Sequence, residues 1–178
     1  MKNYLEESIK ECGMNIMLKA TTPAKRTLFE VDPKLRAMNK EEGESFHRIV
    51  AKLLYVYIWA RVDILLPVGF LCTRVSTSTE QDQAKLKRVL EYINGTINLE
   101  YTLGADSLNK LWTWVDASYA VHPDMEIHTG GLLSLSLGGI AQKSTKHKLN
   151  TKSSTEAELV QIVLWVQMFV EAQGYKIE

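Results

Sequence analysis

The chain has 178 residues, of which 46% are hydrophobic and 24% are charged, as in ordinary globular proteins that bury a core. Its 21 basic and 21 acidic residues balance, which excludes a protein whose whole surface binds nucleic acid but leaves room for a local basic patch. Cys12 and Cys72 have no metal-ligand spacing, which argues against a zinc site and for a reducing, intracellular compartment, cytoplasmic or nuclear. The N-terminus lacks the apolar core of a signal peptide and no apolar stretch would span a membrane, so we expect a soluble protein.

The first part of the chain, residues 1–96, follows the helical period. A short helix is predicted near Tyr4 to Cys12, ended by Gly13, and a proline-containing irregular segment follows it up to about residue 41. The next helix is predicted from apolar residues that recur every three or four positions. These residues are Phe46, Ile49, Val50, Leu53, Leu54 and Tyr57. A second apolar segment, residues 64–75, comes after a polar break.

A third helix has clear start and stop signals. Ser78 and Gln81 have the spacing of a capping box, and Asn94-Gly95 supplies a C-terminal stop. Its apolar stripe consists of Leu86, Val89, Leu90 and Ile93. Its other face carries Lys85, Lys87 and Arg88, for which an ordinary solvated helix face is the alternative to a binding role.

After residue 97 the apolar period shortens to two, which indicates strands. A strand is predicted over Leu111 to Ala120, and a half-buried strand over Leu132 to Leu137, where leucine alternates with serine. Gly138-Gly139 predicts a two-residue hairpin turn into a third strand from Ile140. A helix from about Ser154 to Gln173 closes the pattern. We therefore predict an α+β fold: a helical N-terminal segment, then antiparallel strands and a helix that begin a mixed sheet.

The predicted sheet lacks a cover for one edge. Open strand edges pair readily with other strands, so a partner or a second copy of the chain could associate there.

Two carboxylates stand out as candidates for chemistry. Asp116 lies inside an apolar strand, where a carboxylate is costly unless it is paired or binds a cation. Glu158 lies in the first turns of the last helix, and we expect the two carboxylates to approach each other and to share Mg²⁺. Glu156 completes a capping box with Ser153, so it is expected to cap the helix instead. The alternative for Asp116 is a residue that simply points to solvent.

A basic stretch precedes this helix. Residues 142–155 contain four lysines and a histidine but no acid before the helix begins. The four lysines are Lys143, Lys146, Lys148 and Lys152. Beside a carboxylate pair, such a stretch suits a nucleic-acid backbone, and a solvated loop is the alternative.

The run WTWVDASYAVHPDMEIHTGG, followed by QKSTKHKLNTKSSTEAELV, resembles the ribonuclease H region of copia-type retrotransposon Pol polyproteins. Upstream, FHRIVAKLLYVYIWARVDILLPVGFLCTRV and LKRVLEYINGT resemble the segment that ends the reverse transcriptase. The resemblance covers nearly the whole chain in the same order. It implies a helical region resembling the reverse transcriptase thumb or connection over residues 1–96, and a truncated ribonuclease H-like domain, an incomplete β-β-β-α unit, over residues 97–178.

The family hydrolyses the RNA strand of RNA–DNA hybrids with four carboxylates and two Mg²⁺ ions. The resemblance assigns Asp116 and Glu158 to the first two carboxylates. It places the lysines of the basic stretch along the hybrid, and Lys85, Lys87 and Arg88 in a helical region that contacts the duplex. The third and fourth carboxylates of the family and its Tyr-x-Asp-Asp polymerase motif have no counterpart here. We therefore expect this chain to be inactive, or alternatively to serve as a non-catalytic module that binds nucleic acid or protein.

Overall fold

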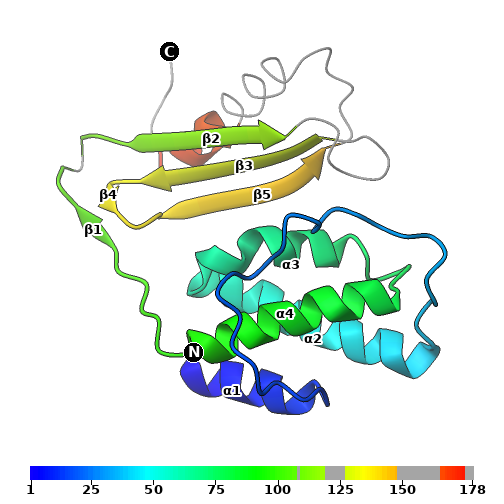
Figure 1. The fold of residues 1–178 in the computed structure, drawn as a ribbon. Helices are drawn as coiled ribbons and strands as arrows, with labels where there is room; N and C mark the ends of the chain where they lie inside the picture. The colour runs from blue at the N-terminus through cyan, green and yellow to red at the C-terminus, as the bar shows by residue number, and fades with distance from the viewer. Residues whose placement is uncertain (108, 119–126, 148–164, 175–178) are drawn as a thin grey trace. The chain divides into compact units, whose positions relative to one another are not determined.

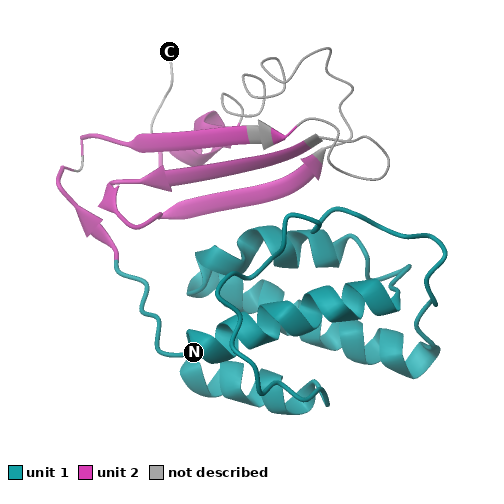
Figure 2. Cartoon of the chain, in the orientation of Figure 1, with its two compact units in different colours: residues 1–102 teal, residues 103–178 magenta. Residues whose placement is uncertain are grey.

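The computed structural model describes residues 1–107, 109–118, 127–147 and 165–174 (Figure 1). The chain divides into two compact units, Met1–Thr102 and Leu103–Glu178, shown in different colours in Figure 2. The first unit is helical and the second is built on antiparallel strands, so the fold is α+β as predicted. Within the described residues, no helix is both long and apolar enough to cross a membrane.

The helical unit is built from four α-helices and one 3-10 turn. They are α1 (Lys2–Glu11), α2 (Lys40–Trp59), η1 (Val62–Ile64), α3 (Leu65–Cys72) and α4 (Glu80–Gly95). The predicted stripe of α2 is largely buried, and α4 buries every residue of its predicted stripe. Sixteen buried hydrophobic side chains from α1 to α4 and the irregular segment form one core. The helical period of the sequence therefore predicted both the elements and their inner faces.

The start of α4 lies one residue later than predicted. Thr79, not Ser78, is the N-cap, and the side chain of Asp82, not Gln81, accepts from its backbone N–H at 3.0 Å. Asp82 is fully buried and also accepts from the Thr79 hydroxyl at 3.1 Å, whereas Gln81 accepts a hydrogen bond from Asp32 of the irregular segment. Tertiary burial of the carboxylate decided which of two overlapping capping patterns is used.

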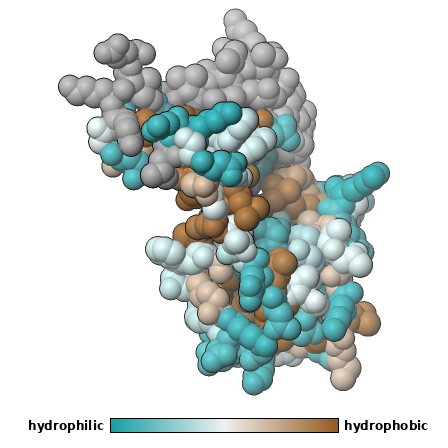
Figure 3. Space-filling view, turned by 90° about the vertical axis from the view of Figure 1, so that its left-hand side faces the viewer, coloured by the Kyte–Doolittle hydropathy of each residue, from teal (hydrophilic) through white to brown (hydrophobic). Residues whose placement is uncertain are grey.

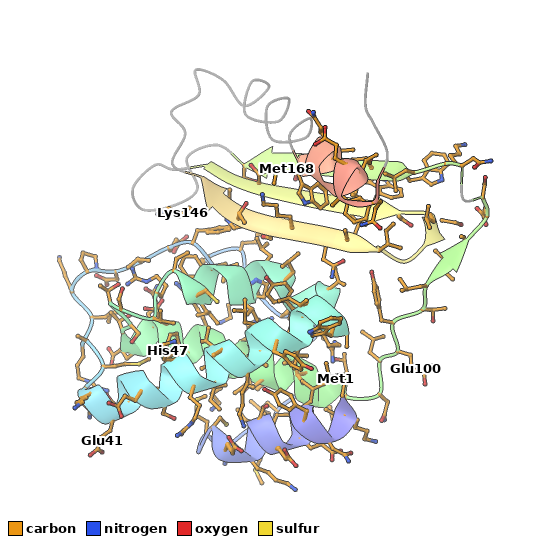
Figure 4. All side chains as sticks on the ribbon, turned by 180° about the vertical axis from the view of Figure 1, so that it is seen from behind. Met1, Glu41, His47, Glu100, Lys146 and Met168 are labelled. Atoms are coloured by element: carbon orange, nitrogen blue, oxygen red, sulfur yellow. The ribbon has the colours of Figure 1, made fainter. Side chains whose placement is uncertain are left out.

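The second unit contains a three-stranded antiparallel sheet in the order β2 (Trp112–Ser118), β3 (Ile127–Ser134) and β5 (Ala141–His147). Residues 165–172 are helical and lie over one face of this sheet, where Figure 4 labels Met168. The predicted antiparallel pairing of the three strands is confirmed. The rest of the predicted last helix lies outside the described residues.

The predicted two-residue turn at Gly138-Gly139 is wrong. β3 ends at Ser134, and residues 136–137 form a separate strand, β4, that pairs with β1 (Gly104–Ala105). The hydroxyl of Ser134 accepts from Ser136 N at 3.0 Å and donates to Gly138 O at 2.5 Å. These local hydrogen bonds replace the strand ladder and let the chain turn away before it enters β5.

Candidate functional site

Asp116 lies at the centre of β2, directly opposite Gly130 of β3. Its side chain is exposed, and β2 is an edge strand of the three-stranded sheet as described. The prediction that Asp116 stands mid-strand in an antiparallel sheet is therefore confirmed. A carboxylate in this position is open to water and to a cation on one face of the sheet.

The register assigns Asp116 to one of the two faces. Side chains alternate along a strand, and directly paired residues point to the same side. Gly131 points to the face on which Trp165 lies, because a Cβ on Gly131 would stand 2.8 Å from the Trp165 ring. Asp116 pairs with the neighbouring Gly130, so it points to the opposite face, which we call the Asp116 face.

Two tryptophans share the Asp116 face. Trp112 is 43% exposed and Trp114 is 50% exposed, and their rings stack at a centroid distance of 6.3 Å and an interplanar angle of 23°. The ammonium group of Lys110 lies 4.1 Å from the Trp112 ring centroid, within the range of a cation–π contact. This arrangement was missed from the sequence, although the alternation of the two tryptophans with Thr113 was visible there.

Polar residues of the neighbouring strands complete the Asp116 face. The side chains of His128 in β3 and Ser144 in β5 form a hydrogen bond, with the His128 Nε2 and the Ser144 Oγ 2.6 Å apart. Lys146 pairs with His128 in the register and therefore lies on the same face, near the end of β5 (Figure 4). Lys143 pairs with Gly131 and points to the other face. The two described lysines of the basic stretch are thus divided between the faces.

The remaining candidates of this site lie outside the described residues. They are Glu156, Glu158, Lys148 and Lys152. The expected approach of Asp116 to Glu158 and the capping role of Glu156 therefore stay predictions. Among the described residues, no three His, Cys, Asp or Glu side chains come together in a group that could hold a metal.

A magnesium site would use Asp116 as one of its ligands. Mg²⁺ takes oxygen ligands, retains several waters and is commonly held by one or two carboxylates together with phosphate oxygens. The exposed Asp116 carboxylate fits one such position. A second protein oxygen would have to come from elsewhere, and Glu158 is the predicted source.

The basic residues predicted on α4 do not form a uniform solvated face. Lys85 donates to the backbone oxygen of Glu30 at 2.6 Å, and its ammonium lies 4.6 Å from the ring centroid of Phe70. Burial lowers the pKa of Lys85, opposed by the attraction of Asp82. Arg88 donates to the hydroxyl of Thr22 at 2.9 Å. Two of the three cations thus hold the irregular segment against the helix.

A pocket of about 330 Å³ opens between this segment and α4. Its lining contains four cationic side chains and one carboxylate. These are Lys25, Lys85, Lys87 and Arg88, together with Glu91. Lys25 was not singled out from the sequence, because it lies sixty residues upstream of the others in an irregular segment.

Three of the known proteins that the chain resembles at low identity show what it is related to. The chain is 33% identical over 114 residues to the retrovirus-related Pol polyprotein from transposon RE1 of Arabidopsis thaliana, a match of 64% of this chain and 8% of that protein. It is 26% identical over 156 residues to an uncharacterized mitochondrial protein of Arabidopsis thaliana, covering 87% of this chain and 63% of the relative. It is 31% identical over 112 residues to secreted RxLR effector protein 161 of Plasmopara viticola, covering 61% of this chain and 78% of the relative.

No protein-family model and no solved structure matches the chain. The chain spans less than two thirds of the Pol polyprotein and of the mitochondrial protein, so the activities of whole relatives do not transfer to it directly. The match to the Plasmopara protein covers most of that relative, and the match to the Pol polyprotein indicates where such sequences come from. The chain therefore belongs to the same family as the Plasmopara protein, and its similarity to the Pol polyprotein and to the mitochondrial protein supports a retroelement origin.

Proposed function

We propose that the chain derives from the junction of reverse transcriptase and ribonuclease H in a copia-type Pol polyprotein, and that the Asp116 face is its ancestral ribonuclease H site. The observation that carries the proposal is the exposed Asp116 at the centre of an antiparallel edge strand. The ancestral reaction is the Mg²⁺-dependent hydrolysis of RNA in an RNA–DNA hybrid, in which metal ions activate a water and stabilise the leaving oxygen.

In this proposal Asp116 and Glu158 are the metal ligands. A polypeptide of these 178 residues carries two of the four carboxylates that the family uses, and two Mg²⁺ ions at close range repel each other without enough anionic ligands. It should therefore bind a divalent ion weakly and should not cleave a hybrid. Lys146 lies on the same face and contributes positive charge toward the phosphate backbone.

Metal binding at Asp116 is tested with Mn²⁺, which replaces Mg²⁺ and broadens nearby NMR signals. We expect broadening of the amide signals of Asp116 and Gly130, and its loss in the Asp116→Asn variant. Glu171→Gln removes an exposed carboxylate of the same unit and should leave the broadening unchanged. Equal broadening in wild type and Asp116→Asn would overturn the assignment of the site.

Cleavage is tested with a labelled RNA–DNA hybrid in Mg²⁺. We expect no cleavage by the 178-residue polypeptide and weak, salt-sensitive binding. Cleavage that Asp116→Asn abolishes would refute the expected inactivity but would support the ribonuclease H assignment. A polypeptide that neither binds Mn²⁺ at Asp116 nor binds the hybrid would refute the whole proposal.

A second candidate function is favoured by the two exposed tryptophans. Aromatic rings on a sheet surface stack with the bases of single-stranded nucleic acids, at about 1–3 kcal/mol per base. Trp112 and Trp114, with Lys110 beside them, have this arrangement, so the alternative is a non-catalytic module that binds single strands. The double variant Trp112→Ala and Trp114→Ala should lose single-strand binding, whereas Trp59→Ala, which removes an exposed tryptophan of the helical unit, should retain it.

A further inference from the structure

The irregular segment of residues 16–32, which we call the strap, runs antiparallel to α4 and is bound to it at successive positions (Figure 1). At one end Asn94 donates to Ile16 O at 3.3 Å, and the Ala20 amide donates to Glu91 O at 3.4 Å. At the other end the Asp32 amide donates to Gln81 at 3.0 Å. These contacts fix the strap along one side of the helix.

Two further contacts hold the strap to α4 on either side of a pocket. Arg88 donates to Thr22 at 2.9 Å and Lys85 donates to Glu30 O at 2.6 Å, and the seven residues between Thr22 and Glu30 arch over the space between the two cations. Leu28 within the arch is only 4% exposed and anchors it to the core. The pocket of about 330 Å³ is the space under this arch, and its size falls within the range of small-ligand sites.

The pocket collects positive charge in a chain whose net charge is zero. Lys85 and Arg88 border it. The side chains of Lys25 and Lys87 line it and form no hydrogen bond or ion pair with the described residues, and Glu91 is the one acidic residue of the lining. The Nε of Arg88 is buried and has no hydrogen-bond partner within the described part of the chain. An unsatisfied buried donor is costly, and an anion in the pocket would supply its acceptor.

We propose that the strap pocket binds a phosphate group, through the side chains of Lys25, Lys87 and Arg88. Lys85 contributes charge but directs its ammonium to the strap backbone, so it is a positioning residue. A guanidinium fork and two flexible ammonium groups match the charge and geometry of phosphate. The phosphate belongs either to a free nucleotide or to a polynucleotide backbone, which share this chemistry. The site lies in the helical unit and does not depend on the ribonuclease H proposal for Asp116.

The test follows amide chemical shifts of the full chain by ¹H–¹⁵N NMR. Three ligands are titrated separately at constant ionic strength: inorganic phosphate, a nucleoside monophosphate and a single-stranded DNA of 12 nucleotides. Acetate is the anion control. We expect phosphate to shift the amide signals of residues 24–28 and 84–91, and acetate to leave them in place. Shifts confined to other parts of the chain, no shifts with any of the three ligands, or equal shifts with acetate would each overturn the proposal.

Matched variants separate the pocket from general positive charge. Lys25→Ala with Lys87→Ala should weaken phosphate binding by about tenfold or more, because both charged donors are lost. The double variant Lys10→Ala and Lys34→Ala removes the same charge from exposed positions outside the pocket and should bind as wild type. Equal affinities of the two double variants would overturn the assignment. Arg88→Lys, which keeps the charge but not the fork, should lower affinity without unfolding the chain.

The source of the phosphate is decided by the same variants. If the DNA backbone is the ligand, the DNA should bind more tightly than the mononucleotide. The slope of log K against log salt for DNA binding should then flatten by about 0.7 per lost phosphate contact in the Lys25→Ala, Lys87→Ala variant. If a free nucleotide is the ligand, the mononucleotide should bind more tightly than the DNA.

Discussion

The end of α2 and the end of α4 are joined by one buried cation, Arg61. It is 2% exposed, and its Nε and Nη2 donate to the carboxylate of Asp63 at 2.9 and 2.8 Å. Its Nη2 and Nη1 also donate to the hydroxyl and the backbone oxygen of Thr96 at 2.7 and 3.2 Å. Its guanidinium lies 5.6 Å from the ring centroid of Tyr92. Burial raises the pKa of Asp63, but the hydrogen bonds from Arg61 and Tyr92 outweigh it and keep the pKa below its ordinary value.

The structure predicts that the two members of this pair are not equivalent. Asp63→Leu leaves the Arg61 charge buried and short of its carboxylate partner, and should cost about 3–5 kcal/mol of unfolding free energy. Arg61→Leu should cost less, because the side chain of Asp63 is 27% exposed and can regain water. Replacing both residues by leucine should cost less than the sum of the two single changes, since neither charge is then left unpaired.

Urea unfolding followed by far-UV circular dichroism measures these differences, because most of the described helix lies in the unit that Arg61 stabilises. For a unit of about 100 residues, 3 kcal/mol also corresponds to a loss of more than about 10 °C in melting temperature. A cost of less than about 1 kcal/mol for Asp63→Leu would refute the reasoning. So would a double variant whose cost equals the sum of the single ones.

Two further predictions concern helix capping and the sheet. The hydrogen bond from Arg36, and after it the one from the Asn39 backbone, lowers the pKa of Glu42 from 4.5 to about 2. The stabilisation that ionised Glu42 gives to the cap of α2 should therefore be complete above pH 4.5 and should be lost as the pH falls toward 2. An NMR titration of the Glu42 carboxyl measures this, and Arg36→Ala should return the pKa toward 4.5. In the sheet, Gly131→Ala should displace the Trp165 ring and destabilise the unit by about 1–3 kcal/mol, because the added Cβ would stand 2.8 Å from it. Gly130→Ala is the control, since no described atom lies closer than 4.0 Å to its Cβ. Equal fluorescence and stability changes in both variants would contradict the packing.

Exposed hydrophobic side chains occur in both units and on the stretch that joins them. Leu99 and Leu103 are more than half exposed, and Figure 3 shows hydrophobic residues at the surface on one side of the molecule. The period of the sequence did not predict this, because these residues lie outside its regular stripes. Scattered exposure of this kind is ordinary in folded proteins and carries no function by itself.

The sequence by itself determined the helices of the first unit, the three long strands of the second, and the buried faces of α2 and α4. Burial of an apolar stripe is the main source of helix stability, so the stripe of α4 predicted both its existence and its buried side. The alternation around Asp116 likewise predicted a mid-strand carboxylate in an antiparallel sheet. These predictions succeeded because they depend only on the spacing of apolar residues that lie close together in the sequence.

Only the tertiary structure decided the features that join distant segments. Thr79 rather than Ser78 caps α4 because Asp82 is buried, which the capping pattern does not reveal. β3 ends at Ser134 because side-chain hydrogen bonds compete with the ladder, although the leucine alternation continues past it. The pocket under the strap needs Lys25 beside Arg88, and no local period relates residues so far apart. Such contacts follow from how the chain packs on itself, because their energy comes from groups that approach each other only in the folded state.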